Sequence, residues 1–266
     1  MIIDSHEHLL LPVERQLAKM DEAGIERAVL FGTTPHPELA KDLMALETEM
    51  AALQKILAGD NPQAYCERLR EKNAEVSRMV ARYPERFWGF GNVPLGLELT
   101  QTKAWLEEQI TALGLCGVGE IAPGNETQMR QIGTILQAMQ RTRIYPLWVH
   151  TFAPVSRDSL AILMELCQRY ENIPVIFGHL GGTHWLEVIK FAKGQPNVYL
   201  DLSAAFSTLA VKMALTELPQ RCLYSSDAPY GEPLLSRQLV EYMSPSSAIA
   251  AAVLGENTQR VLNLIG

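Results

Sequence analysis

The sequence is poor in the features that mark secreted or membrane proteins. It has only four cysteines in 266 residues, widely spaced and without a CxxC pair, which excludes a disulfide framework and favours reduced, packed thiols. Its longest apolar run, Ala248–Leu254, is far shorter than the ~20 residues of a membrane span. The N-terminal segment lacks the basic region and apolar block of a signal peptide, so we expect a cytoplasmic protein.

Positive charge is also scarce. The chain has 23 Lys and Arg against 30 Asp and Glu, a net charge of −7, and no cluster of basic residues. Neutralising nucleic-acid phosphates or an anionic membrane surface requires clustered Lys and Arg, so we expect neither partner and predict a small-molecule ligand instead. The hydrophobic fraction of 47% is that of an ordinary globular protein, and no linker or low-complexity stretch interrupts residues 1–266. We therefore predict a single domain over the whole chain.

Short continuous apolar runs alternate with longer amphipathic segments along the chain. Continuous runs are typical of strands that are covered on both faces, and eight such strands separated by helices favour a parallel (β/α)₈ TIM barrel, an α/β fold. An open doubly wound sheet is the alternative. The eight runs are Ile2–Ile3, Ala28–Phe31, Phe87–Phe90, Cys116–Val118, Pro146–Val149, Val175–Phe177, Val198–Leu200 and Cys222–Leu223.

One connection is longer than a barrel requires. Between the second and third runs lie two helical patterns, Glu38–Leu57 and Ala64–Tyr83, separated by the turn signal Gly59–Pro62. One helix belongs to the barrel and the other is a helical insertion after the second strand. The insertion is either a lid or homodimer contact, or an additional packed helix.

The first apolar run is followed directly by Asp-Ser-His-Glu-His. Residues two apart on a strand point to the same side, so His6 and His8 converge on one volume at the barrel face where active sites form. Alone, the pair is compatible either with two metal ligands or with two polar residues at a strand end.

Four other predicted strands also end in a potential metal ligand. These residues are Glu120, His150, His179 and Asp227. Four of the six histidines of the chain thus lie at strand ends, which favours a metal site over chance clustering. Three imidazoles and one carboxylate suit Zn²⁺, with Mn²⁺ as a further option and a water completing the coordination.

Several motifs together resemble the amidohydrolase superfamily of metal-dependent barrels, in the branch that includes aminocarboxymuconate semialdehyde decarboxylase. The resemblance covers nearly the whole chain. The matching segments are D-S-H-E-H (Asp4–His8), W-V-H (Trp148–His150), F-G-H-L-G-G (Phe177–Gly182), S-S-D-A-P (Ser225–Pro229) and G-E-N-T-Q-R-V-L-N-L (Gly255–Leu264).

The resemblance implies that His6, His8, His150 and Asp227 bind a divalent metal. It also implies that His179 is either a catalytic histidine or a ligand of a second ion. Asp227 is a candidate general base for metal-activated water.

Glu120 departs from the one-metal pattern of that branch. Its carboxylate either bridges two metal ions, with His150 and His179 holding the second, or only orients a histidine. The other motifs match the one-metal branch better, so we predict a single zinc ion with Glu120 close to it. His36, Phe152 and Tyr230 follow strand ends and are candidate substrate-binding residues.

The function predicted first is a zinc-dependent hydrolase in which activated water attacks a C–N or C–O bond of a small molecule. The alternative is a metal-dependent non-oxidative decarboxylase with the same ligands, because fold and ligands do not fix the reaction. None of the four strand-end motifs contains Arg, which lowers the decarboxylase reading. A non-enzymatic metal-binding barrel is a third reading, which the presence of both Asp227 and His179 disfavours.

Overall fold

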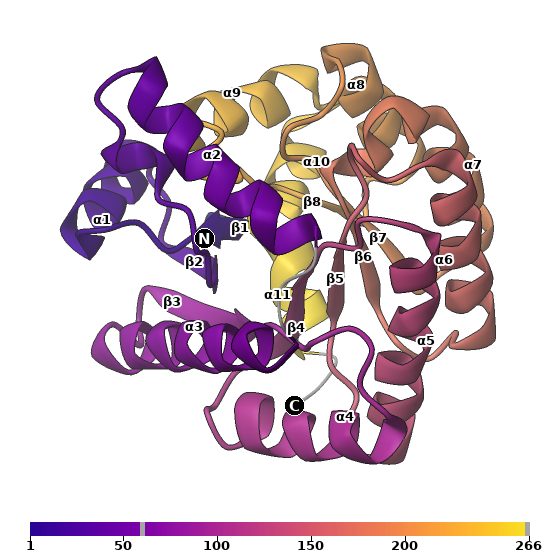
Figure 1. Cartoon of the computed structure of the whole chain (residues 1–266). Coiled ribbons are helices and arrows are strands. Elements are labelled where there is room, and N and C mark those ends of the chain that lie inside the picture. Colours follow the sequence, from indigo (N-terminus) through magenta and orange to yellow (C-terminus); the bar gives the residue numbers. More distant parts are fainter. Residues whose placement is uncertain (59–61, 264–266) are drawn as a thin grey trace.

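The computed structural model describes residues 1–58 and 62–263. Eight parallel strands follow one another in chain order around the sheet, each paired with the next (Figure 1). The strands are β1 (Ile3–His8), β2 (Arg27–Phe31), β3 (Phe87–Gly91), β4 (Gly117–Ile121), β5 (Leu147–His150), β6 (Val175–Gly178), β7 (Val198–Asp201) and β8 (Cys222–Leu223).

Backbone contacts between the first and last strands close the sheet into a barrel. The amide of Ser5 donates to the carbonyl of Tyr224 (2.9 Å), and the amide of His8 donates to the carbonyl of Ala228 (2.8 Å). The predicted (β/α)₈ barrel is therefore confirmed, and the open-sheet alternative is wrong.

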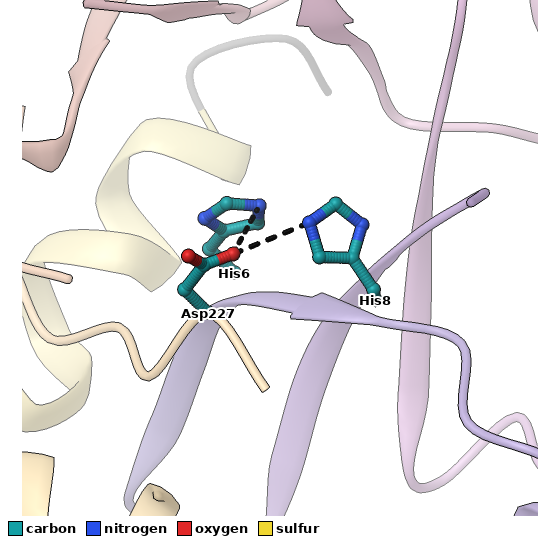
Figure 2. Close-up of side chains that lie close together, drawn as sticks. All are labelled: His6, His8 and Asp227. Atoms are coloured by element: carbon teal, nitrogen blue, oxygen red, sulfur yellow. Dashed lines mark ion pairs between the residues drawn. The ribbon is translucent and has the colours of Figure 1, made fainter. Parts of the chain in front are cut away.

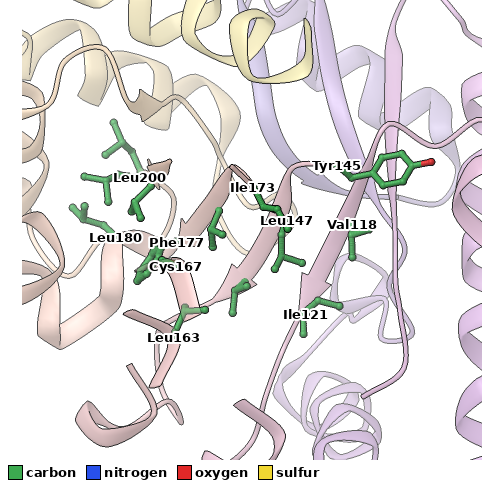
Figure 3. Close-up of a cluster of buried hydrophobic side chains, with 14 of the residues drawn as sticks. Val118, Ile121, Tyr145, Leu147, Leu163, Cys167, Ile173, Phe177, Leu180 and Leu200 are labelled. Carbon is green, nitrogen blue, oxygen red and sulfur yellow. The ribbon is translucent and has the colours of Figure 1, made fainter. Parts of the chain in front are cut away.

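Helices connect successive strands and surround the barrel (Figure 1). Their apolar faces pack against the outer faces of the strands, where the largest buried cluster lies; Figure 3 shows part of it around β4, β5 and β6. The helices are α1 (Val13–Glu22), α2 (Leu43–Ala58), α3 (Pro62–Arg82), α4 (Leu99–Trp105), α5 (Glu126–Arg141), α6 (Arg157–Arg169), α7 (Trp185–Gly194), α8 (Thr208–Glu217), α9 (Pro233–Met243), α10 (Ser247–Ala251) and α11 (Asn257–Asn263).

The long connection after β2 holds two helices, as predicted. Helix α3 packs on the barrel: a Cβ on Gly89 of β3 would collide with the side chains of Val76 and Val80. Helix α2 is the insertion, and Glu49 on it accepts a hydrogen bond from the amide of His36 (3.0 Å). The turn expected at Gly59–Pro62 lies, for residues 59–61, outside the described residues. The role of α2 as a lid or a dimer contact stays a prediction.

The first strand is longer than its apolar run. Only Ile2–Ile3 had the apolar character expected of a covered strand, yet β1 continues to His8 with all six residues buried. The extension is possible because polar groups of neighbouring strands meet its polar side chains inside the barrel. Below this polar end, a second apolar cluster fills the interior around Phe31, Phe90 and Trp148, with Val261 of α11 packed into it.

Candidate metal centre

Three of the predicted ligands meet at the closure between β1 and β8. The Nε2 atoms of His6 and His8 lie 3.7 and 3.2 Å from the same oxygen, Oδ1 of Asp227. Figure 2 shows both rings directed at this carboxylate. The backbone holds the arrangement, because the amide of Asp227 donates to the carbonyl of His6 (2.9 Å).

Glu120, at the end of β4, lies on the other side of these histidines. Its Oε2 atom is 3.5 Å from Nε2 of His8 and 3.8 Å from Nε2 of His6. Its Oε1 atom is hydrogen-bonded to Nδ1 of His150 (2.8 Å) and lies 3.9 Å from Nε2 of His179. The Glu120 carboxylate therefore stands between two groups of histidines.

These separations fit ligands of a shared cation better than direct hydrogen bonds. Most exceed hydrogen-bonding distance, and among the described residues Nε2 of the fully buried His6 has no hydrogen-bond partner. Ligand atoms around a tetrahedral zinc ion lie about 3.3 Å from one another. Buried polar nitrogens without partners are costly, and a metal ion would satisfy them. The donor set thus fits a divalent cation.

The potential ligands of the described residues form three overlapping groups of mutually close atoms. The first is His6, His8 and Asp227, the second is Glu120, His150 and His179, and the third is His6, His179 and Asp201. His150, expected beside His6 and His8, thus falls in the second group, where its Nδ1 lies 3.1 Å from Nε2 of His179. The structure brings all six predicted strand-end residues into one cluster.

Asp201, at the end of β7, is a buried member of the site that the sequence reasoning missed. Its Oδ2 atom accepts from the indole nitrogen of Trp148 (3.1 Å) and lies 3.5 Å from Nδ1 of His6. A carboxylate behind a histidine fixes the tautomer that leaves the other nitrogen free for a metal. The sequence could have indicated Asp201, because this polar residue directly follows the apolar run Val198–Leu200.

His179 is oriented in the same way. Ser203 donates its hydroxyl proton to Oδ1 of Asp201 (2.5 Å), so its oxygen accepts from Nδ1 of His179 (2.9 Å). This leaves Nε2 of His179 directed at Glu120 and His150. The amide of His179 also donates to Asp201 (3.2 Å), which fixes the backbone of the loop after β6.

Asp4 forms a second buried support that was not predicted. Its Oδ1 atom accepts from the amides of His6 (3.1 Å) and Ser226 (3.0 Å), which joins the strand of the histidines to the segment before Asp227. Burial, and then the neighbouring Glu7, raise the pKa of Asp4 well above its usual value.

The histidines and carboxylates of the cluster shift one another's pKa values. Burial alone would lower the pKa of His179, but Glu120, Asp201 and Asp227 outweigh it and raise the pKa to about 9. Burial would raise the pKa of Glu120, but His150, His179 and His8 hold it well below its usual value. The site therefore attracts positive charge, as a metal centre requires.

Both predicted catalytic residues have left-handed backbone conformations, with φ of 58° at His179 and 59° at Asp227. Non-glycine residues rarely adopt this region, and when they do they cluster at functional sites.

The three predicted substrate-binding residues differ in their distance from the cluster. The ring of Tyr230 lies 5.7 Å from that of His8, and the ring of Phe152 lies 6.5 Å from that of His179. His36 is bonded through Nδ1 to Glu38 (3.0 Å) in the loop after β2. Tyr230 and Phe152 thus adjoin the candidate metal centre, whereas His36 is engaged in its own loop.

Comparison with known families identifies the class to which this fold and site belong. The model of the amidohydrolase family matches residues 3–264. The chain therefore belongs to the amidohydrolase family, as its motifs indicated. No curated protein matches the sequence.

Solved structures with the same fold include several decarboxylases. The chain resembles 2,6-dihydroxybenzoate decarboxylase from Rhizobium, with a TM-score of 0.72, 16% identity, and coverage of 100% of this chain and 99% of that one. It also resembles 5-carboxyvanillate decarboxylase from Sphingomonas paucimobilis, with a TM-score of 0.70, 16% identity and 98% coverage of both chains.

A third similar structure carries a metal. It is a dihydroxybenzoic acid decarboxylase from Polaromonas with bound manganese and the inhibitor 2-nitroresorcinol, at a TM-score of 0.66, 18% identity, and coverage of 99% of this chain and 97% of that one. At these identities the likeness shows a shared fold. Within the described ranges, no helix combines the length and apolar character that crossing a membrane requires.

Proposed function

We propose that this chain is a divalent-metal-dependent enzyme that removes a carboxyl group, without oxidation, from a small aromatic carboxylic acid. The observation that carries the proposal is the convergence of His6, His8, Glu120 and Asp227 beside His179 at the end of the barrel. The structural likeness to decarboxylases of dihydroxybenzoate and carboxyvanillate supports this reaction above the hydrolysis that the sequence favoured.

The proposed metal is a single ion held by His6, His8, Glu120 and Asp227. The two nitrogen and two oxygen donors suit Zn²⁺, and the two carboxylates also suit the Mn²⁺ that one similar structure contains. A bound divalent ion would supply a positive centre for an oxygen of the substrate. The alternative is two ions bridged by Glu120, with His150 and His179 holding the second.

The proposed reaction needs one proton from the chain. Breaking the bond between the ring carbon and the carboxylate releases CO₂ and leaves an electron pair on the carbon, which takes up a proton to form C–H. Asp227 and His179 are the proposed holders of that proton; the proposal is supported by Nε2 of His179, which is directed into the cluster, and by Asp227, which borders it.

The substrate ring is proposed to lie against Phe152 and Tyr230. The two aromatic side chains adjoin His179 and His8, from the loops after β5 and β8. The loop of His36 follows β2 and opens on the same face of the barrel. It is proposed to border the entrance.

Hydrolysis of a C–N or C–O bond is the second candidate. Among the described residues, no Lys or Arg forms an ion pair with the carboxylates of the cluster. Arg157, the first arginine after β5, is exposed and pairs with Glu187 (2.8 Å). A substrate carboxylate would therefore depend on the metal ion and on protonated His179 for its counter-charge, whereas a neutral amide or ester needs none.

One experiment separates the two reactions. The protein, reconstituted with Mn²⁺ or Zn²⁺, is incubated with hydroxybenzoates, amides and lactones in water enriched in deuterium and oxygen-18, and the products are analysed by mass spectrometry. A decarboxylase gives CO₂ and a product with deuterium on the ring carbon. A hydrolase gives a product with oxygen-18 instead, which would overturn the proposal. The His6→Ala variant, treated identically, is the control for contaminating activity.

A further inference from the structure

A glutamine interrupts the buried apolar face of α1. Val13 and Met20 face the barrel as expected of an amphipathic helix, but Gln16 between them is also fully buried. A buried amide is tolerated only when its donors and acceptors are satisfied. The partners of Gln16 therefore indicate why the side chain is there.

All the bonds of this amide go to the carboxyl end of β1. Its Oε1 atom accepts from the amide of Leu10 (3.1 Å). Its Nε2 atom donates to the carbonyl of His8 (3.2 Å) and to Oε2 of Glu7 (2.7 Å). The side chain of Gln16 thus forms hydrogen bonds with Glu7, His8 and Leu10.

We propose that Gln16 is a positioning residue for the metal ligand His8, which it holds by bonding the backbone carbonyl of His8, the backbone amide of Leu10 and the side chain of Glu7. The inference rests on the metal centre of the proposed function. Neither the sequence motifs nor the candidate ligand groups include Gln16.

Helix α1 contributes to holding the end of β1 near His8. The amide of His8 is held by the carbonyl of Ala228, on the β8 side. The carbonyl of His8 and the amide of Leu10 lie where β1 turns into the loop before α1, and Gln16 bonds both. Without Gln16, the amide of Leu9 still donates to the carbonyl of Phe31 (3.0 Å), but the carbonyl of His8 and the amide of Leu10 lose their bonds to α1.

Metal binding is sensitive to small shifts of the His8 ring, so a restraint on the backbone of His8 affects affinity. Nε2 of His8 lies 3.2 Å from Oδ1 of Asp227 and 3.5 Å from Oε2 of Glu120, so the position of this ring decides how well His8 can share an ion with either carboxylate. Metal–ligand distances tolerate only about 0.2 Å of error. A small rotation of the His8 backbone would move its ring by more than that.

The test compares Gln16→Met with Met20→Ala. Methionine keeps the length and helix propensity of glutamine but removes all three hydrogen bonds. Met20 is buried one turn further along the same face, so Met20→Ala weakens the packing of α1 without touching the bonds to β1. The Mn²⁺ dissociation constant is measured by calorimetry at a temperature where all proteins are folded, and the melting temperature is measured without metal.

We expect Gln16→Met to bind Mn²⁺ about ten- to a hundredfold more weakly than the wild type. Met20→Ala should melt at a lower temperature than the wild type and keep its affinity. Wild-type affinity in Gln16→Met, or equal loss in both variants, would overturn the positioning role while leaving the metal centre intact. A wild-type protein that binds no Mn²⁺ would overturn the proposed metal centre and this inference together.

Discussion

At the scale of single residues, Asp227 combines two roles that substitution can separate. Its Oδ1 atom lies near both His6 and His8, and it is also a candidate for holding the reacting proton. Asp227→Asn keeps an oxygen near the proposed metal but replaces a carboxylate, which can accept a proton, with an amide, which cannot. Turnover should fall about a hundredfold or more, with metal partly retained. Steady-state kinetics and elemental analysis check this, and unchanged turnover would remove Asp227 from the chemistry.

Substitution of Glu120 distinguishes a one-ion site from a two-ion site. If it is a ligand of a single ion, Glu120→Gln leaves one equivalent that binds more weakly, because a neutral amide is a poorer ligand. If it bridges, the substitution lowers the metal content from two equivalents towards one. Metal per chain after dialysis, in wild type and variant, decides between these outcomes; we expect one equivalent in the wild type.

At the scale of elements, strand-end placement was predictable because it follows from the barrel topology. Parallel strands end at one face, so the polar residues at the ends of apolar runs identified four of the six clustered positions, and the motif on β1 gave the other two, both histidines. Which of the six residues lie next to one another was not predictable from the sequence. It depends on side-chain directions such as that of His150, whose Nδ1 turns towards Glu120 rather than His8.

The position of Asp201 after an apolar run could have been noticed in the sequence, but the contacts that Asp201 and Asp4 make could not be predicted, because they join distant segments. Asp201 contacts His6 across the barrel, and Asp4 bonds Ser226 at the opposite end of the chain. Only the folded structure brings these residues together.

The packing of β5 against β6 links the apolar interior to the site. A Cβ on Gly178 of β6 would collide with the ring of Trp148, whose indole nitrogen donates to Asp201. Gly178→Ala should therefore destabilise the fold by about 1–3 kcal/mol, through overpacking. Chemical denaturation measures the change.

Gly194 is the matched control for this substitution. A Cβ there meets nothing within 4 Å, at the exposed end of α7. Gly194→Ala should leave stability unchanged or slightly raise it, by about 0.5 kcal/mol. Equal effects of the two substitutions would contradict the packing of Trp148 on Gly178.

At the scale of the whole molecule, we expect the packing of the barrel to stabilise the fold without the proposed metal. The buried apolar clusters extend around the barrel and through its interior, whereas the candidate ligands occupy one end of it. A core of this size needs no ion to fold, so we expect the circular dichroism spectrum to persist after chelation. Loss of the folded signal would show that the metal is structural.

The most direct test of the account is the metal content of the purified protein. After reconstitution with Zn²⁺ or Mn²⁺ and thorough dialysis, elemental analysis should find a divalent ion bound in stoichiometric amount to the wild type. The double variant His6→Ala and His8→Ala, which removes both β1 ligands, should bind none. A folded wild-type protein that retains no divalent ion after reconstitution would contradict the metal centre on which the proposed function depends.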